Sequence, residues 1–198
     1  MKLLSPMITI LTLLTSMALT SPTPANLIPR ACTTLAPTAI DILDSTNPDT
    51  ASIGQQFSLA RTPTTNTKIS ALTFTDIPTD ATGCMLAIDI PPALAQPIAT
   101  GSSTQADIWT TSPWNLTTSS PLPTWNNPPS RQEMVSTYEF PTSPSTSPVH
   151  RILASNSCSN TMSFLAVLST WQTTSGSVDF ENEIGGSQSI GFSLVFNC

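Results

Sequence analysis

The stretch Gly83-Cys84-Met85-Leu86-Ala87-Ile88-Asp89-Ile90-Pro91 indicates the fold of this chain most directly. Leu86, Ile88 and Ile90 alternate with neighbours that include Asp89, and Pro91 closes the run. One apolar face and one solvated face is the pattern of an antiparallel sheet. The stretch therefore predicts a β-strand with one face in a core.

The same kind of pattern recurs along the chain between turn residues. In Lys68–Thr75, alternation places Ile69, Ala71 and Thr73 on one face and Ser70, Leu72 and Phe74 on the other. Helical periodicity is nearly absent. The predicted strands are Ala39–Leu43, Gln55–Ala60, Ile69–Phe74, Cys84–Ile90, Asp107–Thr110, Val135–Phe140, Val149–Ala154, Met162–Trp171 and Ser189–Phe196. Short strands at this spacing predict an all-β fold, a single antiparallel β-sandwich.

Two segments rich in Pro, Ser and Thr interrupt the strands. Thr111–Glu133 and Pro141–Pro148 are predicted as loops, because proline cannot donate to a β-ladder. The first is longer than an ordinary unstructured loop, which points to mobility or function.

The start of the chain has the layout of a secretory signal peptide. Met1-Lys2 is followed by a mostly apolar run to Leu19 and by small residues that suit cleavage. We expect a signal peptide at 1–20, a leader or pro-segment at 21–31 and the β-sandwich domain at 32–198. The protein is then secreted, extracellular or in the cell wall, without a membrane segment once the signal is removed.

Charge and composition exclude some partners. Charged residues make up 9% of the chain, the net charge is −6, and there are 19 prolines. Without a basic cluster, neither nucleic acid nor anionic lipid is an expected partner. Ser/Thr with Pro is a composition that accepts sugar outside the cell, and Asn115-Leu116-Thr117 is an N-glycosylation sequon.

The cysteines are Cys32, Cys84, Cys158 and Cys198. In an exported chain they predict two disulfides, and their spacing is unlike that of a zinc site. Four cysteines allow three pairings, and sequence does not choose among them. Since Cys32 and Cys198 flank the domain, we favour pairings that each contain one terminal cysteine.

The sequence predicts no metal site, cofactor or catalytic residue. His150 is the single histidine, and Gly185-Gly186-Ser187-Gln188-Ser189 has Ser where a nucleophile elbow ends in Gly. Asp179, Glu181 and Glu183 are each two positions apart, so they would share one face of a strand. A glycosidase could use Glu181 and Glu183 as its acid and base. Solvated charges at a strand end are the alternative that we favour.

The tryptophans are the remaining candidates for binding. Trp171 ends an apolar strand and is expected in the core. Trp114 and Trp125 lie in the long polar loop, where they either stack on a ligand such as a sugar or anchor the loop to the sandwich. We favour the anchoring role and keep ligand binding as the alternative.

Three segments resemble a known family. They are the strand Gly83–Pro91, the preceding Phe74-Thr75-Asp76-Ile77-Pro78 and the closing Phe192-Ser193-Leu194-Val195-Phe196. With the signal and leader, they resemble small secreted fungal proteins classed by a But2 C-terminal-like domain. The matching parts cover about half of the mature chain. The family name refers to binding a ubiquitin-like modifier, which an exported chain would not meet, and the resemblance supplies no catalytic motif.

Two functions follow from these observations as hypotheses. The first is a secreted, non-catalytic protein at a cell wall or host surface, with cell-wall polysaccharide or an extracellular protein as its partner. The second is an extracellular polysaccharide hydrolase that uses paired carboxylates such as Glu181 and Glu183.

Overall fold

The computed structural model describes residues 31–114, 116, 121–186 and 188–198. The expected signal peptide, nearly all of the leader and the sequon residue Asn115 lie outside the described residues. No helix in the described part of the chain is long and apolar enough to span a membrane.

The regular structure of the described residues consists of β-strands. The strands are β1 (Thr33–Leu35), β2 (Ala39–Asp44), β3 (Ile53–Gly54), β4 (Gln56–Arg61), β5 (Asn66–Phe74), β6 (Cys84–Ile90), β7 (Ala99–Gly101), β8 (Gln105–Thr111), β9 (Arg131–Glu139), β10 (Val149–Asn156), β11 (Met162–Leu168), β12 (Gly176–Glu181) and β13 (Gly191–Phe196). Each of the nine predicted strands corresponds to one of these. The strands β1, β3, β7 and β12 were not among the nine predicted. For β1, β3 and β7 the reason is that two or three residues are too few to show alternation.

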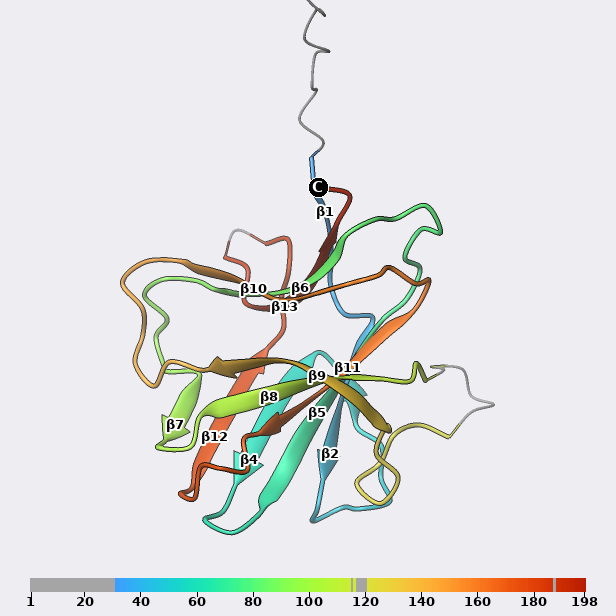
Figure 1. The fold of residues 1–198 in the computed structure, drawn as a ribbon. Helices are drawn as coiled ribbons and strands as arrows, with labels where there is room; N and C mark the ends of the chain where they lie inside the picture. The colour runs from blue at the N-terminus through green and yellow to red at the C-terminus, as the bar shows by residue number, and fades with distance from the viewer. Residues whose placement is uncertain (1–30, 115, 117–120, 187) are drawn as a thin grey trace, which may run out of the picture.

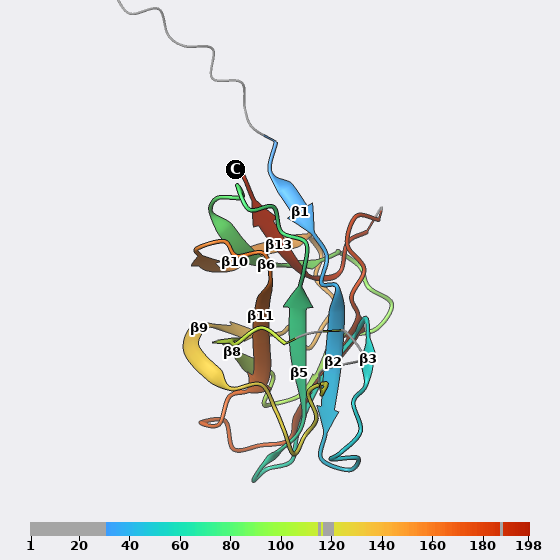
Figure 2. The same ribbon diagram turned by 90° about the vertical axis from the view of Figure 1, so that its right-hand side faces the viewer.

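The strands form two antiparallel sheets (Figures 1 and 2). The smaller, of 4 strands, has the order β1-β13-β6-β10. The larger, of 9 strands, has the order β7-β12-β4-β5-β11-β8-β9, with β2 bonded to β5 and β3 bonded to β2. The predicted β-sandwich is confirmed.

One hydrophobic core joins the two sheets. Phe57 of β4 lies at its centre, with its ring 4.9 Å from the rings of Phe180 in β12 and Phe192 in β13. Phe140, which follows β9, has its ring 5.9 Å from that of Phe57. Tilted and stacked aromatic pairs at these separations add to the stabilisation from burial alone. Because Phe57 and Phe180 belong to the larger sheet and Phe192 to the smaller, this cluster holds the sheets together.

All four cysteines form disulfides, but not in the pairing that we favoured. Cys32 bonds to Cys198 (Cα–Cα 4.4 Å) and Cys84 to Cys158 (Cα–Cα 5.1 Å). The two terminal cysteines therefore share one bond, because β1 and β13 pair along the edge of the smaller sheet and bring the termini together. Figure 1 shows the C-terminus beside the start of β1.

The second disulfide also follows a β-ladder. Asn156 of β10 pairs with Cys84 of β6, so the chain leaving β10 places Cys158 beside Cys84. Two disulfides are typical of a protein that folds in an oxidising environment such as the outside of the cell.

A buried carboxyl group lies on β2. Asp41 is 1% exposed; its Oδ1 accepts the Ser52 N–H at 2.7 Å, and its Oδ2 has no hydrogen-bond partner among the residues described. Burial raises the pKa of Asp41, and the hydrogen bond from Ser52 only partly offsets this. Asp41 therefore holds its proton to higher pH in the folded than in the unfolded chain.

Mapping the disulfides under non-reducing conditions should find the Cys32 peptide linked to the Cys198 peptide. A link from Cys32 to Cys84 or Cys158 would contradict the structure. Replacing Cys84 and Cys158 together by Ala should lower the free energy of unfolding by about 4 kcal/mol, because the bond closes a loop of 74 residues. Urea denaturation of the oxidised proteins measures this difference.

The variant Asp41→Asn tests the raised pKa. Between the unfolded pKa of about 3.9 and the higher folded value, the native state binds more protons, so stability falls as pH rises through this window. Each pKa unit of difference contributes about 1.4 kcal/mol. Urea denaturation from pH 4 to pH 7 should therefore show this fall in wild type and in the exposed-site control Asp80→Asn, but not in Asp41→Asn. Parallel pH profiles for all three proteins would refute the assignment.

Candidate functional site

The two central strands of the larger sheet are buried on both faces. Residues 69–74 of β5 and all of β11 are buried, whereas the alternation in the β5 segment had predicted one solvated face there. One face joins the main core, while the other forms a second hydrophobic group, here called the outer cluster. The outer cluster consists of Leu43, Ile69, Ala71, Leu165 and Val167.

Three tryptophans cover the outer cluster. Trp109 of β8 and Trp114 and Trp125 of the 112–130 loop are half-buried against it. The Nε1 atoms of Trp109 and Trp114 are inaccessible to solvent and have no hydrogen-bond partner among the described residues. The packing of Trp114 on the outer cluster and its solvent-inaccessible Nε1 favour the anchoring role for this indole.

The loop near Trp125 is held by polar contacts to a different turn. The Asn126 N–H donates to the Pro48 carbonyl at 3.0 Å, and the Asn126 side-chain amide donates to Asp49 Oδ1 at 2.7 Å. The Asn127 N–H donates to the Thr124 carbonyl at 3.1 Å. These bonds fix the part of the loop that carries Trp125.

Trp171 is not in the core, and this prediction was wrong. Its side chain is 65% exposed, because β11 ends at Leu168 and the chain then turns. The Ser169 N–H donates to the Gln105 carbonyl at 2.8 Å and the Gln172 N–H to the Ser169 carbonyl at 3.3 Å. Trp171 therefore lies in a tight turn directly after the buried run.

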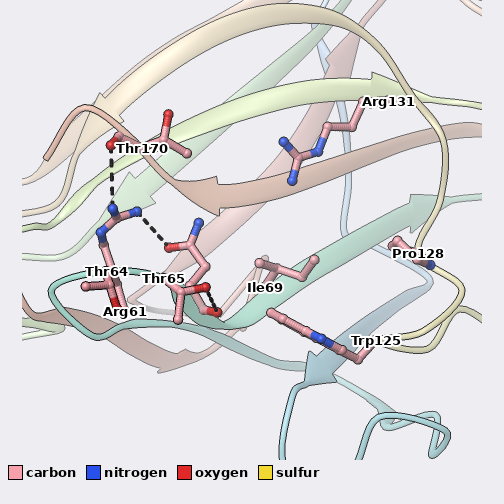
Figure 3. A pocket seen from close by; sticks show the side chains of 9 residues that line it. Arg61, Thr64, Thr65, Ile69, Trp125, Pro128, Arg131 and Thr170 are labelled. Carbon is pink, nitrogen blue, oxygen red and sulfur yellow. Dashed lines mark hydrogen bonds between the residues drawn. The ribbon is translucent and has the colours of Figure 1, made fainter. Parts of the chain in front are cut away.

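A pocket of about 490 Å³ opens beside the tryptophan-covered face. This volume is within the range of small-ligand sites. The pocket collects residues from the β4–β5 hairpin, the turn after β11, the 112–130 loop and the start of β9 (Figure 3). Its lining consists of Arg61, Thr64, Thr65, Asn66, Ile69, Trp125, Pro128, Arg131 and Thr170.

Arg61 is a buried cation on one side of this pocket. Only 8% of the residue is exposed. Its Nη1 donates to Asn66 Oδ1 at 3.4 Å and its Nη2 to the Thr170 carbonyl at 3.5 Å, as Figure 3 shows. Its Nε is buried and has no hydrogen-bond partner in the part of the chain that the structure describes. Arg61 thus has long bonds to neutral acceptors and retains donor capacity.

Arg131 supplies the second positive charge. It is the exposed first residue of β9, and its guanidinium carbon lies 5.6 Å from the centre of the Trp109 ring, a cation–π contact. In the described residues, the ion pairs within 4 Å join Lys68 to Asp44 and His150 to Asp89. Neither arginine of the pocket belongs to one.

The carboxylates considered for hydrolysis do not line this pocket. Glu181 and Glu183 are exposed at the end of β12, and Asn182 between them is buried. The Asn182 amide accepts the Phe192 N–H at 2.6 Å and donates to the Phe192 carbonyl at 3.2 Å. The segment therefore joins β12 to β13 through Asn182, while its two glutamates face solvent.

Among the described residues, His150 is paired with Asp89 and is not placed between an acid and a serine; Ser187, the serine of the elbow-like stretch, lies outside these residues. The Nδ1 of His150 is 2.7 Å from Asp89 Oδ1, and Ser189 lines the same hollow. However, β6 lies between β13 and β10, so Asp89 separates the β13 side of the sheet from His150. A Ser–His–Asp relay requires the imidazole in the middle. Among the described residues, no group of three His, Cys, Asp or Glu side chains could hold a metal ion.

Sequence reasoning missed Arg61, Arg131 and the exposure of Trp171. The two arginines are 70 positions apart in the chain and show no motif. Their scarcity was the one available signal, because the whole chain has only 6 Lys and Arg residues.

No family model and no curated protein matches this chain.

Replacing Trp114 by Ala should destabilise the protein by about 2–4 kcal/mol, because the indole covers the outer cluster. The control Trp171→Ala removes an indole that is 65% exposed and should change stability by about 0.5 kcal/mol or less. Urea or thermal unfolding compares the two. Equal stability of both variants would show that Trp114 is not an anchor.

Proposed function

We propose that this protein is a secreted, non-catalytic glycan-binding protein of the cell wall or a host surface. The observation that carries the proposal is the pocket beside the outer cluster, where Trp125 forms part of the lining together with hydroxyl and amide side chains. Sugars present an apolar ring face and a rim of hydroxyls. An indole with nearby Thr and Asn groups complements both.

The position of the pocket fits this role. It is built by loops and strand ends on a rigid sandwich, which is where recognition usually resides in such folds. The described part of the loop is held through Asn126, so Trp125 is fixed in place before a ligand arrives. Preorganisation of this kind lowers the entropic cost of binding.

Trp171 extends the proposed binding surface. It follows Thr170 of the lining directly, and its indole is mostly exposed. We assign Trp171 to contacts with a second sugar unit of an oligosaccharide.

The hydrolase hypothesis has less support. Glu181 and Glu183 point to solvent at a strand end, and the pocket lining contains no carboxylate. Glycoside hydrolysis commonly needs two carboxyl groups on either side of the scissile bond.

The function is tested by retention on insoluble polysaccharides, with chitin, cellulose, β-1,3-glucan and pectin as the panel. We expect wild type to be retained on at least one of them, and Trp125→Ala and Trp171→Ala to be retained less. Trp125 also packs on the outer cluster, so thermal unfolding must show that this variant is folded under the assay conditions. Trp114→Ala, if folded, should keep its retention.

The outcome that would contradict the proposal is equal retention of wild type, Trp125→Ala and Trp171→Ala. Absence of wild-type retention on every member of the panel, together with no binding of soluble oligosaccharides, would contradict it as well.

A further inference from the structure

The pocket beside the outer cluster has an unusual charge for this protein. The chain has 12 acidic residues and 6 basic ones, and only four of the basic residues lie in the described part. Two of those four, Arg61 and Arg131, line one pocket that contains no Asp or Glu. A hollow with two guanidinium groups and no acid attracts an anion, even in a chain that is negative overall.

Among the described residues, the positive charge of Arg61 has no carboxylate partner. A buried cation is normally paired with an acid or bonded through all of its donors, since removal of its water is costly. Arg61 is 8% exposed, has no carboxylate within 4 Å among the described residues, and has an Nε without a partner. An anionic ligand in the pocket would supply the missing counter-charge.

The rest of the lining determines what else the ligand carries. Figure 3 shows Arg61 and Arg131 on different sides of the pocket, with Ile69 and Trp125 next to each other in the lower part of the view. The hydroxyls of Thr64 and Thr65 and the amide of Asn66 complete the polar rim. A small inorganic anion would leave the apolar wall uncovered, whereas a sugar ring with an acid substituent would contact both kinds of group.

We propose that this pocket binds an acidic oligosaccharide, with acid groups on the Arg61 and Arg131 sides of the pocket and a sugar ring against Trp125. This inference rests on the proposed glycan-binding function and specifies its ligand class. The acid is a carboxylate, as in a uronic acid, or a sulfate ester; both accept the paired N–H donors of arginine.

The experiment uses the oxidised, secreted protein and isothermal titration calorimetry with three soluble probes. They are an oligogalacturonate, the same oligomer with its carboxyl groups reduced to hydroxymethyl groups, and a sulfated galactose oligomer. We expect at least one acidic probe to bind about ten- to a hundredfold more tightly than the reduced probe, as loss of a charged hydrogen bond predicts. The tighter acidic probe identifies the acid group.

Arg131→Gln should remove this preference, because it deletes the accessible guanidinium while leaving the core intact. Arg131→Lys should keep only part of it, since an ammonium cannot form a two-pronged bond. The matched control is Arg151→Gln, which removes one exposed positive charge from β10, outside the pocket. This control should bind as wild type does.

Three results would overturn the inference. If the reduced oligomer binds as tightly as both acidic probes, the ligand is a neutral glycan and the proposed function stands. If none of the probes binds and the polysaccharide panel also fails, the glycan-binding function fails with the inference. If Arg131→Gln and Arg151→Gln weaken acidic binding equally, net charge rather than the pocket controls affinity.

Discussion

The burial of both faces of β5 and β11 is the constraint on which the rest of the structure depends. Alternate residues of these strands point to opposite faces of the sheet, so two apolar sets must be covered. Leu72 and Phe164 enter the main core, whereas Ala71 and Leu165 belong to the outer cluster. The smaller sheet covers only the first face. A second cover is therefore required, and Trp109 with the 112–130 loop provides it.

The candidate site is a consequence of that cover. Trp114 and Trp125, which both come between β8 and β9 in the sequence, pack on the outer cluster, and Trp125 also lines the pocket beside the turn between β4 and β5. Trp125 thereby reaches the neighbourhood of Arg61, while Arg131 begins the strand that follows the loop. Trp125 thus covers the outer cluster and also lines the pocket. For this reason the indole proposed to bind the ligand also contributes to the stability of the fold.

The strands were predictable from sequence, and the contacts between distant strands were not. Alternation at Cys84–Ile90 shows a strand by itself, since the period of two is a local property. The disulfide pairing depends on which strands are neighbours: β1 lies beside β13, so Cys32 meets Cys198. Likewise, the apolar run at Met162–Leu168 is compatible with a half-buried or a fully buried strand. Trp171 is exposed because the strand ends at Leu168, before it reaches this residue.

The sequence by itself determined that this is an all-β, disulfide-bonded domain with a long proline-rich loop, because composition, cysteine number and periodicity are sufficient for that. Only the tertiary structure decided that Arg61 and Arg131 share a pocket without an acid, and that Trp114 is half-buried against the outer cluster while Trp171 is exposed. The physical reason is that periodicity reports which side of a strand a residue occupies. It does not report what covers that side, because coverage comes from segments that are far away in the chain.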